Sequence, residues 1–485
     1  MSDSHADSIP MEELFKRWGF DSDVFVPDEA RKEKRLGKIF KYPSWFFEVL
    51  GNASNTDFSV VVGHRGAGKS AVRRFIAEHC ETELGARFLK GNVLCITIDH
   101  DVPYWIESLP RGSEPFDAFC SELASLIAIG IAHALLEKKE LTGLVKSQKQ
   151  RLLRYIARLA SRRPEETSEM LMAVQDRFSR VYQKVKSSEL LTDVVKVVTG
   201  GDADIRPDVS EHDGVFTHAD EDVASLVRTS RMCGFDAVYV LIDEIDEHKR
   251  TMNNPRKAAE LIAPVLSSLR LLEMDGIAFK FFLSKTVFAH IQDMCVVKKL
   301  EIRWDRTMHR IPYILEWSED DIAEMLKKRL LAYSIGGGNE VSLNVFGDEA
   351  IEGGIEAQIV ESAYRSPRHF IQFAQTICRY TARVANATNN KITAEVLDRA
   401  KKEYFRWVAD DLYGEACVNS MIRLQMTEFS NADFLKKLRL PKKKGQEALD
   451  ALALGGALKR IAEIGSVTYT VSDPRLIYLM NENSC

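Results

Sequence analysis

The stretch FSVVVGHRGAGKS, residues 58–70, decides the fold that this sequence predicts. Residues 63–70 fit the pattern G-x-x-x-x-G-K-[ST], and the apolar, strand-like run Phe58–Val62 comes directly before them. A helix is expected directly after them, over Ser70–His79. A glycine-rich loop between a strand and a helix turns several backbone N–H groups inward, and the helix N-terminus adds partial positive charge. The stretch therefore predicts a phosphate-binding loop.

Such a loop holds a nucleoside triphosphate together with Mg²⁺. Lys69 is expected to reach the β- and γ-phosphates, and the Ser70 hydroxyl is expected to bind Mg²⁺. The predicted nucleotide contacts are Gly63, His64, Arg65, Gly66, Ala67, Gly68, Lys69, Ser70 and Ala71. No Asn-Lys-x-Asp sequence, a common reader of guanine, follows the later strands. ATP is therefore the expected nucleotide.

Further short apolar runs predict the rest of a sheet. They are Asn92–Ile98, Ala237–Ile242, Ala278–Leu283 and Ile311–Leu315. The runs are continuously apolar, which is typical of parallel strands covered by helices on both faces. Helical stretches lie between them, as the fold class α/β requires.

Polar residues follow several of these strands and are candidate catalytic groups. Asp243 and Glu244 come directly after AVYVLI. Asp243 is expected to hold the magnesium shell, and Glu244 to orient the attacking water or take its proton. Ser284, at the end of the fourth strand, could contact the γ-phosphate or could simply cap the strand, with Lys285 as a nearby alternative. Arg368 follows Ser366-Pro367 at a helix start and could reach the γ-phosphate or remain a surface residue.

The composition limits the partners. The chain has 485 residues, 45% of them hydrophobic and 28% charged, and a formal net charge of −5. This charge exerts no global attraction on nucleic acid or anionic membranes, so such a contact needs a local patch. The apolar run Leu123–Leu136 is shorter than a membrane span and predicts a buried helix. The polar N-terminus, without a signal pattern, and eight scattered cysteines favour a cytoplasmic location without a membrane partner.

The order of segments predicts several domains. We expect a partly disordered lead-in over residues 1–40, with residues 1–15 disordered, and an ATPase core over residues 41–315. A helical insertion would interrupt this core at residues 110–220, with helices over 114–140, 143–163 and 165–185 and a loop over 200–218. The basic residues of 145–163 fit a solvated helix face or a patch that binds nucleic acid or a partner. A helical lid is expected over residues 316–410, beginning with a capping box at Ser318 and Asp321.

The last part of the chain, residues 411–485, predicts a winged helix. Its expected helices are Leu412–Met426, Asn431–Leu438 and Gln446–Ile461. Two extended segments, Val467–Val471 and Leu476–Met480, would form the hairpin. A basic cluster accompanies them: Lys436, Lys437, Arg439, Lys442, Lys443, Lys444, Lys459 and Arg460.

The loop at residues 63–70, the sequence DEID, the polar end of the fourth strand, Ser-Pro-Arg and the terminal winged helix together resemble AAA+ and STAND-type P-loop ATPases. The combination is most similar to the origin-recognition/initiator-like branch and its bacterial defence-associated relatives, over about residues 40–110 and 220–485. The resemblance implies the strand order 5-1-4-3-2, with Ser284 as sensor 1 and Arg368 as sensor 2. It also implies a homo-oligomer in which an arginine completes the neighbouring site. Arg306 is the candidate for that arginine, and Arg303 and Arg310 are alternatives.

Two functions follow from these features. The first is an ATP-hydrolysing switch that changes assembly state and acts on an effector protein, in bacterial stress or antiviral defence. The alternative is an initiator-like ATPase that binds DNA through the winged helix and the basic patch Lys436–Lys444. The early turns of the expected recognition helix are mostly apolar or acidic, which favours phosphate or protein contacts over reading of base edges. A nucleotide-binding scaffold without turnover is a third hypothesis, against which Lys69, Asp243 and Glu244 argue.

Overall fold

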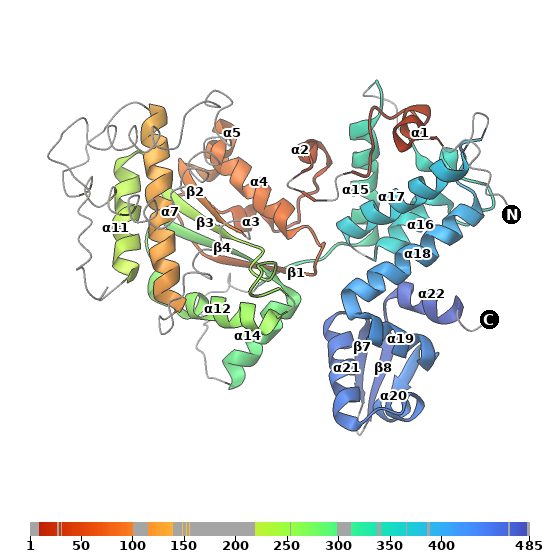
Figure 1. Cartoon of the computed structure of the whole chain (residues 1–485). Helices are drawn as coiled ribbons and strands as arrows, with labels where there is room; N and C mark the ends of the chain where they lie inside the picture. Colours follow the sequence, from red (N-terminus) through yellow and green to blue (C-terminus); the bar gives the residue numbers. More distant parts are fainter. Residues whose placement is uncertain are drawn as a thin grey trace. The chain divides into compact units, whose positions relative to one another are not determined.

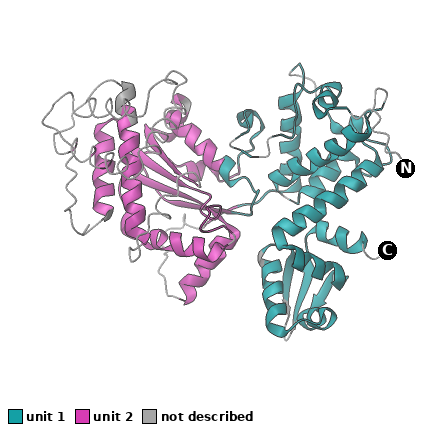
Figure 2. Cartoon of the chain, in the orientation of Figure 1, with its two compact units in different colours: residues 1–42, 63–71, 315–485 teal, residues 43–62, 72–314 magenta. Residues whose placement is uncertain are grey.

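The computed structural model describes residues 9–26, 29–30, 32–99, 115–138, 148, 152, 155, 219–252, 254–297, 312–336, 341–364, 366–385, 389–463 and 466–482. The chain forms two compact units (Figure 2). Unit 1 contains residues 1–42, 63–71 and 315–485, and unit 2 contains residues 43–62 and 72–314.

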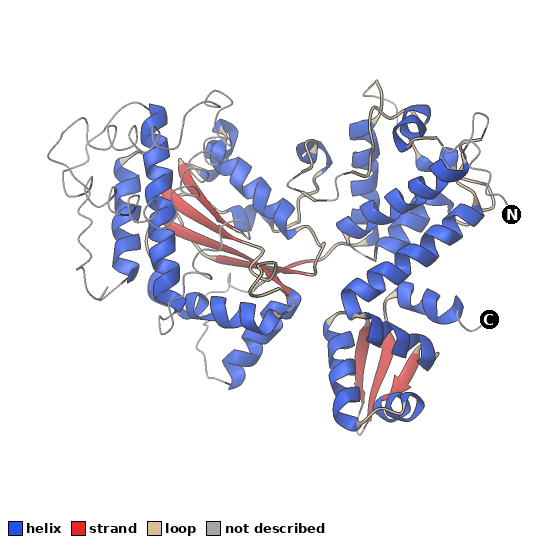
Figure 3. Ribbon diagram, viewed as in Figure 1, coloured by secondary structure: helices blue, strands red, loops and turns tan. Residues whose placement is uncertain are grey.

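A five-stranded sheet lies at the centre of unit 2 (Figures 1 and 3). Its strands are β1 (Ser59–Gly63), β2 (Val93–Ile98), β3 (Ala237–Ile242), β4 (Ile277–Ser284) and β5 (Tyr313–Leu315). The order across the sheet is β2-β3-β4-β1-β5, and the pairs β2–β3 and β3–β4 are parallel. This is the predicted order 5-1-4-3-2 read from the other edge, so the predicted α/β fold class is confirmed.

The continuous apolar runs are explained by burial on both faces of the sheet. Every residue of β1, β3 and β4 is buried. Alternate residues, such as Val238 and Val240 of β3, join one large core with α7 (Pro115–Lys138), α11 (Ala219–Met232) and α12 (Pro255–Ser267). Helices α4 (Lys69–Glu81) and α5 (Glu83–Leu89) lie on the other face (Figure 1). Unit 2 therefore has three layers, as predicted.

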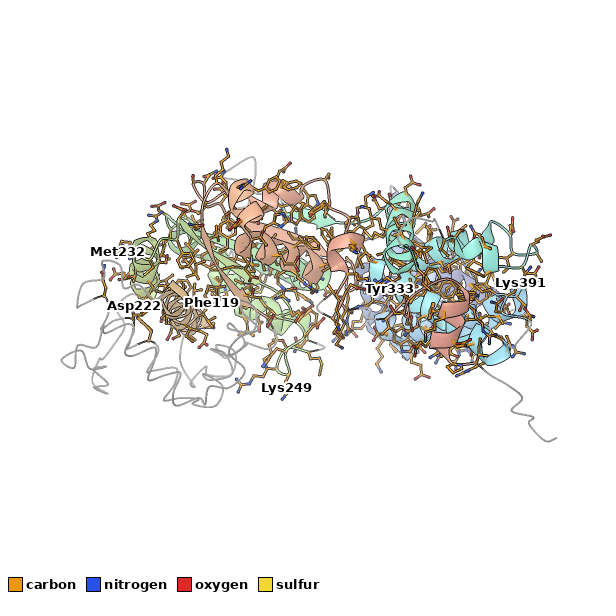
Figure 4. The ribbon with its side chains drawn as sticks, turned by 90° about the horizontal axis from the view of Figure 1, so that it is seen from above. Phe119, Asp222, Met232, Lys249, Tyr333 and Lys391 are labelled. Carbon is orange, nitrogen blue, oxygen red and sulfur yellow. The ribbon has the colours of Figure 1, made fainter. Side chains whose placement is uncertain are left out.

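Helix α7 is the longest described part of the predicted insertion at residues 110–220. It packs along α11, with Phe119 fully buried, whereas Asp222 is only half-buried and Met232 is 41% exposed (Figure 4). Among the described helices, α7 alone has the length and composition of a membrane span, but 72% of its stretch Pro115–Ala132 is buried inside the unit. The predicted buried helix is thus confirmed. Of the predicted helix over 143–163, the structure describes only residues 148, 152 and 155, and all three are helical. The predicted helix over 165–185 and the loop over 200–218 lie outside the described residues.

The N-terminal segment of unit 1 is more ordered than the sequence predicts. Helix α1 (Met11–Arg17) buries Leu14 and Phe15 completely, so the expectation of disorder over residues 1–15 is wrong from residue 11 onward. Trp18 stacks on Phe346 with ring centroids 5.0 Å apart. This segment is held because its aromatic side chains supply core area that a solvated lead-in would expose to water.

A buried ion pair also fastens the N-terminal segment to the first lid helix, α15 (Glu319–Tyr333). Arg329 of α15 and Glu33 lie 2.9 Å apart, and each side chain is only 2% exposed. Tyr333, labelled in Figure 4, donates its hydroxyl to Glu33 at 2.9 Å. Helix α2 (Leu36–Ile39) completes the segment against α15.

Residues 316–410, predicted as a helical lid, contain four helices and a 3₁₀ turn among the described residues. Ser318 and Asp321 form the predicted capping box at the start of α15. The 3₁₀ turn η1 (Leu343–Phe346) follows, and then the helices α16 (Gly354–Ala363), α17 (Pro367–Val384) and α18 (Ala394–Tyr413). Helix α17 is strongly amphipathic and buries its apolar side against α16 and α18.

The C-terminal module contains the helices α19 (Glu415–Leu424), α20 (Asn431–Leu438), α21 (Lys442–Leu454) and α22 (Pro474–Glu482). An antiparallel sheet of order β6-β8-β7 accompanies them (Figure 3). Its strands are β6 (Glu428–Ser430), β7 (Leu458–Glu463) and β8 (Ser466–Val471).

The hairpin of this module differs from the prediction. It pairs β7 with β8, whereas the sequence predicts a helix through Ile461 and a second strand over Leu476–Met480. The latter stretch lies in α22. Pro474 occupies the first position of this helix, where its fixed φ and missing N–H are tolerated.

Candidate nucleotide-binding site

The loop at residues 63–70 has the conformation that its glycines predict. Gly66 and Gly68 have φ of +80° and +97°, a region that residues with a Cβ rarely adopt. The Ala67 N–H donates to the His64 carbonyl at 3.2 Å, which closes a turn. Helix α4 then begins at Lys69, so its first N–H groups and its partial positive charge belong to the loop.

The Lys69 ammonium group folds back over this loop. It donates to the Gly63 carbonyl at 3.2 Å and to the His64 carbonyl at 3.1 Å. These contacts hold a positive charge at the mouth of the loop, where an arriving phosphate would compete for it.

The start of helix α17 lies directly against the loop, within unit 1. Ser366 caps α17, and its hydroxyl donates to the Gly66 carbonyl at 3.3 Å, as does the Arg368 N–H at the same distance. A Cβ added to Gly66 would lie 2.9 Å from the Ser366 hydroxyl oxygen. The structure therefore brings Arg368, predicted as a nucleotide contact, to the loop through its backbone.

Sequence reasoning missed Trp317, which also supports the loop. Its indole N–H donates to the Ala67 carbonyl at 2.7 Å, and the side chain is buried. A tryptophan two residues after a short strand carries no sequence signal for this role, because its partner is a backbone atom distant in sequence.

The two acids after β3 are held in a defined arrangement within unit 2. Asp243 is 2% exposed, and its Oδ1 accepts the Glu244 N–H at 2.9 Å. Glu244 has φ of +59°, an uncommon value for a residue with a side chain. The buried carboxylate directly follows strand β3, and its role in binding magnesium stays a prediction.

Arg73 is the second residue that the sequence analysis missed. It lies on α4, three positions after Ser70, and its side chain is 11% exposed. Its Nε is 3.2 Å from Asp243 Oδ2, its Nη1 donates to Asp99 Oδ2 at 2.8 Å, and its Nη2 is 4.0 Å from Glu244 Oε1. Burial by itself lowers the pKa of Arg73, but these carboxylates outweigh burial and raise that pKa above its ordinary value.

Ser284 acts locally as the cap of helix α14 (Lys285–Val297). Its hydroxyl accepts the Val287 N–H at 3.4 Å and lies 3.1 Å from the Thr286 hydroxyl. The sequence leaves two roles open for Ser284, contact with the γ-phosphate or a simple cap. These contacts are those of a simple cap. Arg306, with Arg303 and Arg310, lies outside the described residues.

The donor groups suit magnesium only when a nucleotide supplies further ligands. Among the described residues, no group of three or more histidine, cysteine or acidic side chains is arranged to hold a metal ion. Mg²⁺ is commonly bound through one or two carboxylates together with substrate phosphates and water. The Ser70 hydroxyl and the Asp243 carboxylate are donors of this type, so they fit a metal that arrives with the nucleotide.

Comparisons with known proteins find similar solved structures at low sequence identity. No family model matches the sequence, and no curated protein matches it. Two similar solved structures are those of the ORC2 protein of Aeropyrum pernix. The structure of its ADPNP–ADP complexes aligns over 93% of this chain and 98% of that chain, with 10% identity and a TM-score of 0.43. Its ADP form aligns over 95% and 96%, with 11% identity and a TM-score of 0.39. At these values the alignments carry no conclusion about what this chain binds.

Proposed function

We propose that this chain binds ATP with Mg²⁺ through Gly63–Ala71 and hydrolyses it with the help of Asp243 and Glu244. The observation that carries the proposal is the loop itself: two glycines with positive φ, a lysine folded over the loop, and a helix beginning at that lysine. Strand order supports the inclusion of the acids, since only β4 separates β1 from β3. In α/β sheets, ligands bind at the carboxyl ends of the strands, where the loop and the acids both begin.

The residues have separate tasks in this proposal. Backbone N–H groups of the loop and the Lys69 ammonium bind the phosphate oxygens. Ser70 and Asp243 would hold the metal, whose positive charge would neutralise part of the phosphate charge. Glu244 orients water for attack and accepts its proton. Ser284 remains a candidate for contact with the γ-phosphate, although its hydroxyl now caps α14.

The contact of α17 with the loop supports a switch function. Because Ser366 and Arg368 both donate to Gly66, a nucleotide that moves the loop would move the start of α17. Arg368 would bind the γ-phosphate and so distinguish ATP from ADP, which is the differential contact that switching requires. We include in the proposal a homo-oligomer with Arg306 acting on the neighbouring site. The similar structures give no support to a role with an effector in stress or antiviral defence, so the proposal does not extend to one.

The hydrolysis proposal is tested by replacing Glu244 with glutamine. This change keeps the size of the side chain but removes the carboxylate that would activate water. We expect phosphate release from Mg·ATP to fall by at least about 100-fold, the scale typical of catalytic groups, while ATP binding is retained. Phosphate release measured on wild type and Glu244→Gln decides this, and undiminished release in the variant would remove Glu244 from the mechanism.

A second function, contact with DNA, is favoured by the surface of the C-terminal module. Eight basic side chains, all exposed, lie on α20, α21, the turn between them and β7. They are Lys436, Lys437, Arg439, Lys442, Lys443, Lys444, Lys459 and Arg460. The early face of α21 beyond its three lysines offers few groups that read bases. We therefore propose contact with DNA phosphates, in the manner of an initiator-like ATPase with a winged helix.

The DNA proposal predicts a salt-dependent loss of affinity. Replacing Lys442, Lys443 and Lys444 with alanine should weaken duplex binding and reduce the slope of log affinity against log salt by up to about 3, since each phosphate contact contributes about 0.9. The matched control removes the same charge elsewhere, through alanine at the exposed Lys34, Lys38 and Lys391. Fluorescence anisotropy over a salt series measures both. Equal losses in the two triple variants would indicate a net-charge effect and would exclude a specific patch.

A further inference from the structure

A single guanidinium group lies among three acids that follow two neighbouring strands. Asp99 follows β2, and Asp243 and Glu244 follow β3, its parallel neighbour. Arg73 contacts Asp99 and Asp243 at 2.8 and 3.2 Å and approaches Glu244 at 4.0 Å. All four side chains are at least 88% buried, given exposed fractions of 11%, 11%, 2% and 12%. Water therefore screens the charges of these three acids only weakly.

Like charges in such a setting repel each other and are costly to bury. Three buried carboxylates without a cation would push one another apart, because burial weakens the screening of their mutual repulsion. Arg73 reduces this cost, since its guanidinium donates to Asp99, lies within 4.0 Å of oxygens of Asp243 and Glu244, and stays charged when buried. Among the described residues, no group of three or more histidine, cysteine or acidic side chains is arranged to hold a metal ion, and Arg73 is a cation that lies directly against these acids.

We propose that Arg73 is an internal cation that compensates Asp99, Asp243 and Glu244 while no metal is bound, and that Mg²⁺ takes over part of this compensation when it arrives with nucleotide. Arg73 is thus a positioning residue: it balances the charge of Asp243 and Glu244 and holds them in place. The inference rests on the proposed nucleotide site and deepens it. It also explains why the helix carrying Lys69 and Ser70 buries an arginine one turn later.

The proposal predicts a coupling between Arg73 and magnesium. The relevant quantity is the ratio of the Kd for ADP in EDTA to the Kd for ADP with Mg²⁺. Without Arg73, the phosphates of metal-free ADP face uncompensated carboxylates, whereas Mg·ADP brings its own cation. In Arg73→Met the ratio should rise at least about tenfold, with the Mg·ADP affinity changed less than about threefold. Arg73→Lys retains the charge and should keep the ratio within about threefold of wild type.

Asp99→Asn is an independent variant that should change the same ratio of dissociation constants in the opposite direction. It removes one negative charge and leaves Arg73 in place, so metal-free ADP should bind more tightly and the ratio should fall below that of wild type. Calorimetry of ADP into the full-length chain, with EDTA or MgCl₂, measures all four proteins. An unchanged ratio in Asp99→Asn, or equal losses under both conditions in Arg73→Met, would overturn the internal-cation role, because a merely structural arginine gives that result. Absence of ADP binding by wild type would instead overturn the proposed function itself.

Discussion

At the scale of single residues, Glu244 has the backbone conformation that most needs an explanation. Its φ of +59° costs roughly 1–2 kcal/mol for a residue with a Cβ. The Asp243 carboxylate, which accepts the Glu244 N–H at 2.9 Å, holds this turn. An unfavourable backbone kept beside a candidate magnesium ligand supports the proposal that the direction of the Glu244 side chain matters for its role.

Lys280 is buried in unit 2, and burying its charged form lowers the stability of the fold. It lies on β4, is 2% exposed, and donates to the Asp57 carbonyl at 3.0 Å. Burial lowers its pKa to about 8. Because the folded pKa lies below the unfolded value, the fold disfavours the charged form. The free energy of unfolding should therefore rise as pH increases from about 8 to about 10.4, and the full cost is present below about pH 8.

Replacing Lys280 with methionine removes this cost. At about pH 7, where the lysine is charged, the variant should be more stable by about 1–2 kcal/mol, since the desolvation cost exceeds the lost hydrogen bond. The advantage should shrink at about pH 9.5, where folded wild type holds the neutral amine. Differential scanning calorimetry of both proteins at the two pH values measures this, with the exposed Lys391→Met as control. An advantage that does not change with pH would contradict the account.

The residues of the candidate site differ in how far sequence can predict them. Gly63–Ser70, Asp243 and Glu244 are predictable because their roles depend on local order, strand then loop then helix, or strand then acid. Arg73 and Trp317 are not, because their partners come from other segments: Asp99 and Asp243 for the arginine, and a backbone carbonyl for the tryptophan. Arg73 carries one signal, a charged residue next to Val72, Phe75 and Ile76 on the buried side of α4.

At the scale of elements, a buried ionic network joins three helices of unit 1. Arg475 of α22 donates to both oxygens of Asp473, and Tyr413 at the end of α18 donates to the same carboxylate at 2.7 Å. Arg475 Nη1 lies 2.8 Å from Nδ1 of His369, the third residue of α17. Burial lowers the pKa of His369 well below its ordinary value, and Arg475 and Arg368 lower it further. The imidazole is therefore neutral and accepts from Arg475.

Breaking this network by Arg475→Met should destabilise unit 1. The change leaves the fully buried Asp473 without its cation, which typically costs about 3–5 kcal/mol. Hydrogen exchange of the peptides covering α17 and α22 should accelerate. The double variant Asp473→Asn/Arg475→Met removes both charges and should recover part of the loss. A double variant as unstable as the single one would show that packing of the arginine, not the ion pair, is what matters.

The elements themselves show where sequence patterns succeed and fail. The strands of unit 2 are predictable because burial on both faces demands continuous apolar runs. Leu458–Glu463, LKRIAE, alternates in a way that also fits the end of an amphipathic helix, and the apolar run within Leu476–Met480 also fits a strand. Short runs of this kind do not distinguish helix from strand. Pairing with β8 makes the first run a strand, and Pro474 begins the helix that contains the second run.

At the scale of the whole molecule, the chain passes from one compact unit to the other and back around the loop at residues 63–70. Residues 63–71 group with the lid and the C-terminal module, whereas the strand before them and most of α4 belong to unit 2 (Figure 2). The contacts of the loop with Trp317, Ser366 and Arg368 explain this grouping. A ligand in the loop would therefore act directly on the lid, which is the physical basis of the switch that we propose.

Calorimetric titration of Mg·ATP into the Glu244→Gln protein, which would bind without turnover, tests the central claim most directly. We expect saturable binding at a single site. Adding Lys69→Ala to that protein should weaken the binding by at least about 100-fold, because the ammonium folded over the loop is lost. An absence of saturable heat, or an affinity that Lys69→Ala leaves unchanged, would contradict it.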